Sequence, residues 1–173
     1  MDTLGLLKIM VRRGINLAVR DKVTGTSDPY VVITMGEQKV KTRYIKKNCN
    51  PEWNEELTLS IKDLNAPISL TVFDKDTFSD DDPMGNAVID IQPYIEAVRL
   101  RKSVGQLPSG VALKKVQPSQ TNDLADESCV ILENDNKITQ KMLLKLKEVE
   151  SGELLIQLEW ADIPGSKGLE PGY

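Results

Sequence analysis

The sequence contains no histidine and only two cysteines, so it lacks much of the chemistry that enzymes and transition-metal sites use. Histidine is the commonest general base and a principal zinc ligand, and its absence removes both roles. Cys49 and Cys129 show no metal-ligand spacing, and the alternatives are a disulfide between them or, as we expect, two reduced thiols in a cytosolic protein. No nucleophile stands beside a base, and no glycine-rich phosphate loop carries a lysine. We therefore predict that the protein is not an enzyme.

Long apolar runs and a strong net charge are also missing. No run approaches the ~20 residues that span a bilayer, and no basic region precedes the short apolar run near the start, as a signal peptide would require. The formal net charge of -4 in 173 residues argues against nucleic acid as a partner. We expect one cytoplasmic domain that meets a membrane only reversibly, through charge and bound ions.

Short segments typical of β-strands fill the first half of the chain. With turn residues between them, they span residues 4–17, 30–35, 38–45, 57–61, 68–73 and 85–91, and apolar and polar residues alternate in the first and third of these. Many short strands separated by turns, with no clear helix among them, are typical of an antiparallel sandwich. We therefore predict an all-β fold.

The pattern changes after this region. Ile91, Ile95 and Val98 recur at helical spacing, and Pro93 suits a first helical turn. The polar stretch that follows holds only short β-like runs, at 111–113 and 129–132.

Regular strand patterns return at residues 142–146 and 153–160. We therefore expect a single domain over residues 1–165, with a small helix/strand insertion at 92–140 before the last two strands. Residues 166–173, rich in glycine, are expected to form a flexible tail.

Carboxylates crowd two separated segments of the chain. The segment from Val72 to Gly85 carries five of them: Asp74, Asp76, Asp80, Asp81 and Asp82. Carboxylates this dense repel one another unless a cation neutralises them. Asp74 and Asp76 are two residues apart, so at a strand end their side chains point the same way. Asp21 and Asp28 flank a flexible loop that could approach the same ion from the other side.

The donor set predicts Ca²⁺, which takes six to eight oxygen ligands at about 2.3–2.6 Å. The spacing is not that of an EF-hand, because no glutamate closes a twelve-residue Asp-x-Asp-x-Asp-Gly loop. Mg²⁺ fits less well because it prefers a rigid octahedral shell with few carboxylates. The alternative is a solvated patch of turn aspartates, and an isolated Asp-x-Asp would favour it. Two separate acidic loops favour the ion site.

Four motifs in order resemble those of C2 domains. They are Ser27-Asp28-Pro29-Tyr30-Val31, Lys41-Thr42-Arg43, Asn50-Pro51-Glu52-Trp53-Asn54-Glu55 and Phe73-Asp74-Lys75-Asp76. The resemblance covers residues 4–91 and 141–160. It implies an eight-stranded antiparallel β-sandwich in the topology whose extra strand lies at the C-terminus. It also implies that the Ca²⁺ carboxylates are Asp21, Asp28, Asp74, Asp76 and Asp82, with the carbonyls of Arg20 and Lys75 completing the shell. Asp80 and Asp81 fall outside that ligand pattern.

A basic stretch and two apolar loop residues provide candidate lipid contacts. Lys39, Lys41 and Arg43 alternate, so their side chains should share one sheet face. The alternative is an ordinary solvated strand face, but the matching positions of C2 domains form a lipid-binding patch. Val23 and Phe78 stand within otherwise polar ion loops and are candidates for shallow membrane insertion, although Phe78 could instead be core.

The insertion narrows the resemblance further. Its motifs Pro93-Tyr94-Ile95-Glu96-Ala97, Gly105-Gln106-Leu107-Pro108-Ser109-Gly110 and Leu124-Ala125-Asp126-Glu127-Ser128, and the end Ile163-Pro164-Gly165-Ser166-Lys167-Gly168-Leu169, resemble plant C2-domain abscisic-acid-related (CAR) proteins. That resemblance implies a Ca²⁺-dependent adaptor for the anionic phospholipid of the plasma membrane, which recruits abscisic-acid receptors of the PYR/PYL type. The nucleus is a further location. The alternative function is stimulation of a partner GTPase through protein contact.

Overall fold

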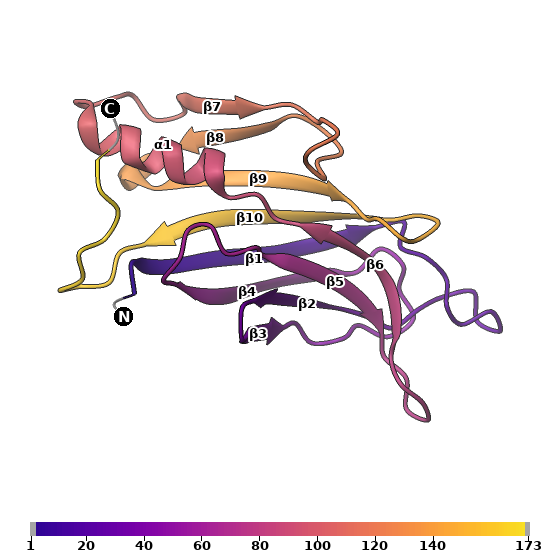
Figure 1. Ribbon diagram of the computed structural model, residues 1–173. Helices are drawn as coiled ribbons and strands as arrows, with labels where there is room; N and C mark the ends of the chain where they lie inside the picture. Colours follow the sequence, from indigo (N-terminus) through magenta and orange to yellow (C-terminus); the bar gives the residue numbers. More distant parts are fainter. Residues whose placement is uncertain (1–2, 172–173) are drawn as a thin grey trace.

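The computed structural model describes residues 3–171, in which two β-sheets pack face to face with a helix beside one of them (Figure 1). One sheet has six strands in the order β4-β1-β10-β9-β8-β7, and the other has four in the order β3-β2-β5-β6. Neighbouring strands pair antiparallel throughout both sheets. The elements are β1 (Gly5–Ile15), β2 (Pro29–Met35), β3 (Gln38–Lys41), β4 (Glu52–Ile61), β5 (Ser69–Asp74), β6 (Asp82–Val88), α1 (Gln92–Ser103), β7 (Ala112–Val116), β8 (Ser128–Leu132), a 3-10 turn η1 (Asn134–Asn136), β9 (Ile138–Lys145) and β10 (Glu153–Ala161).

The predicted all-β sandwich with a helix/strand insertion is confirmed. The eight strands of the prediction correspond to β1–β6, β9 and β10, while β7 and β8 come from the insertion and widen one sheet to six strands. The strand at the end of the chain, β10, pairs with β1 along its length, from Leu6 opposite Ala161 to Ile15 opposite Glu153. The last strand thus supplies the neighbour that β1 needs, as the predicted topology requires.

Several strand boundaries differ from the sequence prediction: β4 begins at Glu52 and β6 at Asp82, both earlier than expected, and two further ends have a clear cause. β3 ends at Lys41, because the hydroxyl of Thr42 accepts a hydrogen bond from Val31 N and itself donates to Arg43 O. β9 begins at Ile138, where its pairing with Leu132 starts, although the polar pattern of the sequence placed its start a few residues later. Side-chain hydrogen bonds and an added neighbouring strand determine these ends, and neither is visible in apolar spacing.

The core lies between the sheets and follows the alternation of the strands. Leu7, Ile9 and Val11 of β1 are all fully buried, and the residues between them are partly exposed. Trp53 is 1% exposed, and its ring nitrogen donates to Pro29 O at 3.2 Å. Trp53 is therefore a packing anchor that joins β4 of one sheet to the start of β2 in the other.

The insertion packs as an integral part of this core. α1 buries Tyr94, Ile95, Ala97 and Val98 and lies alongside β7, β8 and β9 (Figure 1). The hydroxyl of Tyr94 donates to Ile138 O at 2.6 Å and accepts from Trp160 N at 2.7 Å. The helix is thus fixed to the last two strands by hydrogen bonds as well as by apolar contact.

The segment that we expect to be a flexible tail has one buried contact. Leu169 is buried within the core cluster, and its carbonyl accepts from Lys102 Nζ at 2.8 Å. Residues 172–173 of the predicted tail lie outside the described residues. Among residues 3–171, no helix is long and apolar enough to cross a bilayer.

Candidate metal centre

Strand register brings the acidic segments together at one end of the sandwich. Pro29 at the start of β2 pairs with Asp74 at the end of β5, and Asp74 also pairs with Asp82 at the start of β6. Asp28, Asp74 and Asp82 therefore meet at the ends of three adjacent strands. Figure 1 shows the β1–β2 and β5–β6 loops projecting from this same end of the molecule.

A hollow of about 520 Å³ lies between these loops. All seven residues that the sequence predicted for the ion site line it: Arg20, Asp21, Asp28, Asp74, Lys75, Asp76 and Asp82. The structure thus gathers residues from two segments that are far apart in the chain.

Asp74 lies deepest in this arrangement and has the least favourable surroundings for a negative charge. Its Oδ1 accepts from Asp28 N at 2.7 Å, while Asp28 Oδ1 accepts from Lys47 N at 2.7 Å. Burial, and then the nearby charges of Asp28, Asp82 and Asp76, raise the pKa of Asp74 above its ordinary value. A cation would relieve both effects, because it compensates for lost hydration and for like-charge repulsion.

Asp21 and Asp76 are instead bonded within their own loops. Asp21 Oδ1 accepts from Val23 N at 3.0 Å and from Thr24 N at 3.3 Å. The two oxygens of Asp76 accept from Phe78 N at 2.9 Å and from the Ser79 hydroxyl at 2.8 Å. These bonds lower the pKa of both carboxyls, with the Thr24 amide the largest cause for Asp21 and the Phe78 amide for Asp76.

The donor chemistry of the hollow fits a hard divalent cation, because five carboxylates supply oxygen ligands. Across residues 3–171, however, no three acidic groups are gathered closely enough to hold a metal ion as they stand. Asp21 and Asp76 are the two predicted ligands whose oxygens are bonded within their own loops.

Arg20 was predicted to contribute only its carbonyl, and its side chain has a separate structural role. Arg20 Nη1 lies 3.0 Å from Glu150 Oε1, in the turn between β9 and β10, and Arg20 Nε donates to Pro83 O at 3.4 Å. The backbone of Arg20 donates to the Ser27 hydroxyl at 2.8 Å. The first acidic loop is thus held by contacts with two other segments. Nothing in the sequence indicated that Glu150 would be one of the partners.

Asp81 was predicted to be a bystander, and the structure gives it defined partners. Its carboxylate accepts from the hydroxyl of Tyr30 and from Asp76 N, the latter at 2.8 Å. The Tyr30 hydroxyl is the largest cause that lowers the pKa of Asp81, while burial and then that carboxylate raise the pKa of Tyr30 to about 12. The sequence could not separate Asp81 from Asp80, because the bonding partner of Asp81 is distant in the chain.

Only two of the three predicted basic residues lie together on one surface. Lys39 and Lys41 line a second hollow of about 420 Å³, together with Tyr30, Lys75 and Asp81. Arg43 lies beyond the end of β3 and does not line this hollow.

The side chain of Arg43 has partners in β4 instead. Its Nη2 donates to Trp53 O at 3.0 Å, and its Nη1 lies 3.6 Å from Glu55 Oε2. The expectation that three basic side chains share one strand face therefore holds for two of them.

The two apolar loop residues are the most exposed large apolar side chains of the described region. Val23 is 96% exposed and Phe78 is 97% exposed, so neither belongs to the core. They lie in the two loops that form the acidic hollow. An acidic hollow flanked by exposed apolar tips is therefore the chief chemical feature of this end.

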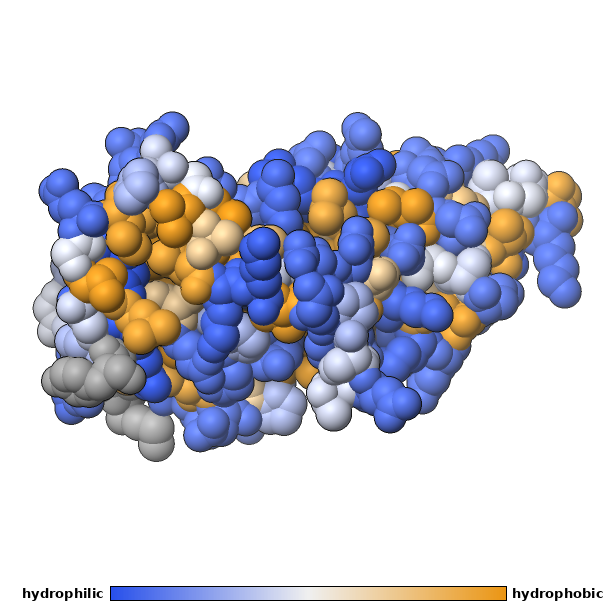
Figure 2. All heavy atoms as spheres, turned by 90° about the horizontal axis from the view of Figure 1, so that it is seen from above, coloured by the Kyte–Doolittle hydropathy of each residue, from blue (hydrophilic) through white to orange (hydrophobic). Residues whose placement is uncertain are grey.

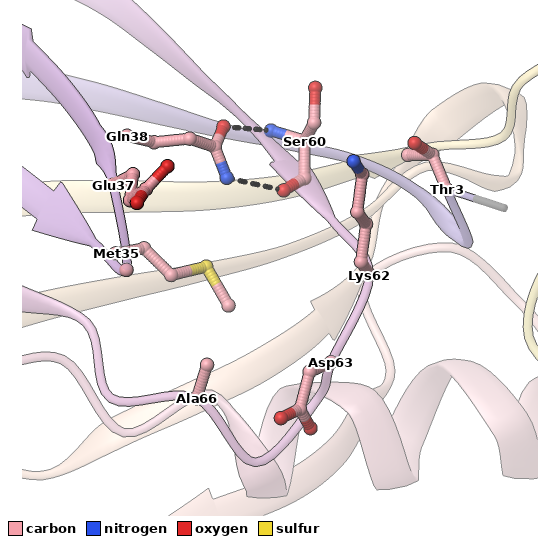
Figure 3. Close-up of a pocket in the computed structure, with 9 residues that line it drawn as sticks. Thr3, Met35, Glu37, Gln38, Ser60, Lys62, Asp63 and Ala66 are labelled. Atoms are coloured by element: carbon pink, nitrogen blue, oxygen red, sulfur yellow. Dashed lines mark hydrogen bonds between the residues drawn. The ribbon is translucent and has the colours of Figure 1, made fainter. Parts of the chain in front are cut away.

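A larger hollow lies elsewhere and is less suited to an ion. It measures about 590 Å³ and lies at the opposite end of β2, near the β2–β3 turn (Figure 3). Figure 3 shows Gln38 reaching across to Ser60, where the amide donates to Ser60 O at 2.7 Å and accepts from Ser60 N at 2.8 Å. This pair joins the edges of the two sheets, which is a structural role.

The sandwich and its loop end define a C2 domain, and the C2 domain family profile matches residues 5–106. Comparison with known proteins shows that the chain belongs to the family of C2-domain ABA-related proteins. It is 55% identical to Protein C2-DOMAIN ABA-RELATED 10 of Arabidopsis thaliana, over 96% of this chain and 91% of the relative. It is 52% identical to GTPase activating protein 1 of Oryza sativa subsp. japonica, over 95% of this chain and 96% of the relative. A calcium-bound structure of the C2 domains of Extended-Synaptotagmin 2 shares the fold, with a TM-score of 0.59 at 23% identity, over 93% of this chain and 47% of that chain.

Proposed function

We propose that this protein is a Ca²⁺-dependent adaptor that docks on anionic phospholipid and brings abscisic-acid receptors of the PYR/PYL type to the plasma membrane. The observation that carries the proposal is the hollow into which five aspartates from two distant loops converge. The likeness in fold to a calcium-bound C2 structure supports it, as do the relatives whose names connect them to ABA. On this proposal the protein divides between the cytoplasm and the membrane surface, with the nucleus as a further location.

The ion would be held by Asp21, Asp28, Asp74, Asp76 and Asp82, with the carbonyls of Arg20 and Lys75. Without it, this end carries a cluster of negative charges that an anionic bilayer repels. A bound Ca²⁺ supplies two positive charges and coordination positions for phosphate oxygens. Because binding is reciprocal, lipid strengthens the affinity for Ca²⁺ by the same factor as Ca²⁺ strengthens the affinity for lipid.

Other residues of this chain would contribute directly to membrane contact. Lys39 and Lys41, which share one hollow on the sheet face, would each add roughly 1 kcal/mol near an anionic surface. Phe78 and Val23 are fully available for insertion between headgroups, and burying a side chain of this size contributes about 1.5–3 kcal/mol.

An adaptor also needs a surface that remains free when the loops face the bilayer. Figure 2 shows apolar residues gathered at the left end of the face seen from above, which is the end of the molecule where α1 finishes in Figure 1. Leu100, Val104 and Leu107, at and just after that helix end, are all more than one-third exposed. Exposed apolar groups of this kind often mark protein contacts, so this end is where we place the receptor.

Liposome co-sedimentation tests the membrane proposal. The protein should sediment with phosphatidylserine vesicles in Ca²⁺ and remain in the supernatant with a chelator. The double substitution Asp74→Ala with Asp76→Ala should abolish sedimentation, whereas Asp80→Ala, which removes a nearby carboxylate outside the hollow, should retain most of it. Sedimentation that neither the chelator nor the double substitution changes would refute the proposal.

Stimulation of a GTPase is a second candidate function, favoured by the rice relative that is named a GTPase activating protein. Such activity would act through protein contact with the partner. Turnover of a candidate GTPase is measured with and without this protein, in the absence of lipid. An unchanged rate would exclude this function for that GTPase and leave the membrane proposal unaffected.

A further inference from the structure

Asp81 lies between two predicted ligands, Asp76 and Asp82, but faces a different surface. It does not line the acidic hollow, and it does line the neighbouring hollow that contains Lys39 and Lys41. Its side chain is 19% exposed, which is low for a carboxylate in a projecting loop. Its position therefore calls for an explanation other than ion ligation.

The two oxygens of Asp81 bond to two different parts of the protein. Oδ1 accepts from the backbone N–H of Asp76 at 2.8 Å, within the same loop. Oδ2 accepts from the hydroxyl of Tyr30 and lies 3.9 Å from Lys75 Nζ. Asp81 is thus a bridge between the backbone of a predicted ligand and a residue of the sheet.

Tyr30 provides a rigid attachment point for this bridge. It is the second residue of β2 and pairs directly with Phe73 of β5. The two rings stack, with centroids 5.6 Å apart and an interplanar angle of 22°. A tyrosine side chain held on a central strand pair loses little further freedom when its hydroxyl bonds to the loop.

The loop has few other means of staying in place. Phe78 at its tip is 97% exposed and so contributes no packing. The remaining bonds of Asp76 run to Phe78 and Ser79, which belong to the same loop and move with it. The contact between Tyr30 and Asp81 is therefore the main side-chain connection between the tip region and the sheet.

We propose that Tyr30 and Asp81 are positioning residues that hold the β5–β6 loop so that Asp76 faces the acidic hollow. The consequence for Ca²⁺ affinity rests on the function proposed above, whereas the ordering of the loop does not. A loop already held in place loses less conformational freedom when it binds, so breaking the bridge weakens ion binding without removing a ligand.

Two matched pairs of variants test the bridge. Tyr30→Phe removes only the hydroxyl, and Tyr44→Phe is its control, because the described residues offer the Tyr44 hydroxyl no hydrogen-bond partner. Asp81→Ala removes the bridging carboxylate, and Asp80→Ala removes the adjacent one, which has no bonding partner among residues 3–171. Backbone order parameters of residues 76–80 are measured by ¹⁵N relaxation in the Ca²⁺-free protein, and Ca²⁺ affinity by calorimetry without lipid.

Tyr30→Phe and Asp81→Ala should lower the order parameters of residues 76–80 from values typical of rigid backbone toward about 0.6, and both control variants should not. Tyr30→Phe should weaken Ca²⁺ binding by about threefold to tenfold, which corresponds to the net contribution of one typical hydrogen bond. Order parameters that Tyr30→Phe leaves unchanged would refute the bridge. If the unmodified protein binds no Ca²⁺, the ion proposal fails, and the relaxation measurement still decides whether the bridge holds the loop.

Discussion

At the scale of single residues, Asp74 has unfavourable surroundings for a negative charge. It is buried at the end of β5, and its pKa is raised chiefly by burial and then by its acidic neighbours. A raised folded-state pKa means that the folded protein holds this proton more tightly than the unfolded chain does. The charged form therefore lowers the free energy of unfolding at neutral pH, and this penalty disappears as the pH falls through the folded pKa.

Asp74→Asn should therefore stabilise the Ca²⁺-free protein at pH 7, by about 0.5–2 kcal/mol, as removal of a functional charge commonly does. The asparagine can keep the hydrogen bond from Asp28 N, because its amide retains one acceptor oxygen. Chemical denaturation in chelator measures the change, and the gain should shrink as the pH is lowered. If Ca²⁺ binds as we propose, it should raise the melting temperature of the unmodified protein, and this variant should lose that increase.

Asp80→Asn is the control for that measurement, since it removes an exposed charge from the same loop. Its stability should stay within about 0.5 kcal/mol of the parent. Asp21, Asp76 and Asp81 have lowered pKa values, so their contributions have the opposite sign and are lost as the pH falls below the ordinary carboxyl range. A destabilised Asp74→Asn protein in chelator would contradict the interpretation of Asp74.

Most of these residues could be predicted from the sequence, because the pattern that identifies them lies within a few neighbouring residues. An Asp-x-Asp pair at the end of an apolar strand points to one side by the geometry of the strand alone. The difference between Asp80 and Asp81 depends on Tyr30, and the side chain of Arg20 depends on Glu150. Contacts between residues so far apart in the chain arise from register, which no local pattern contains.

At the scale of the elements, Gly85 determines how β6 passes under the β9–β10 turn. Its φ of +104° lies in the region that favours glycine. A Cβ added there would lie 2.6 Å from Val149 Cγ1 and 2.9 Å from the Cβ of Leu146. The stretch that carries the second set of aspartates is thus fitted closely against the end of the six-stranded sheet.

Gly85→Ala should consequently destabilise the protein by about 2–4 kcal/mol, the sum of an unfavourable φ and an overpacked contact. Gly36→Ala is a suitable control, because Gly36 also has a positive φ, of +58°, but no atom lies within 4 Å of its added Cβ. The losses of unfolding free energy in the two variants, measured by thermal and urea unfolding, should differ by the cost of the steric overlap at Gly85 alone. Equal losses of stability would show that the β9–β10 turn yields to the added methyl group.

The elements also show where sequence reasoning succeeds and where it stops. The helix was predictable because Ile95 and Val98 recur at helical spacing, and both are buried. The early end of β3 could not be predicted, because it depends on the hydrogen bond that the Thr42 hydroxyl accepts from Val31 N. Periodicity reveals which segments are strands, whereas their limits depend on side chains and on the neighbouring strand.

At the scale of the whole molecule, the two kinds of membrane contact that we propose lie on neighbouring surfaces. The apolar tips are in the projecting loops, and the hollow lined by Lys39 and Lys41 adjoins the acidic hollow, with Lys75 and Asp76 lining both. The first contact depends on apolar burial and the second on charge. They should therefore respond differently to salt.

The pair Lys39→Ala with Lys41→Ala should weaken binding to phosphatidylserine vesicles by about tenfold to thirtyfold at low salt. This loss should diminish steadily as salt is added, because both side chains are exposed to screening ions. Phe78→Ser should weaken binding by an amount that changes little with salt, since apolar burial is not screened. Vesicle co-sedimentation in saturating Ca²⁺, at several salt concentrations, separates the two contributions.

Lys141→Ala with Lys145→Ala is the matched control, because it removes two exposed lysines of one strand in the other sheet. If the basic hollow has a specific role, this control should lose far less affinity than the β3 pair at every salt concentration. Equal losses would mean that only the total charge of the protein matters and that the orientation of the domain on the bilayer is not fixed. A loss confined to the β3 pair would place β3 and the acidic loops against the same bilayer, which leaves the exposed end of α1 directed away from it and open to a protein partner.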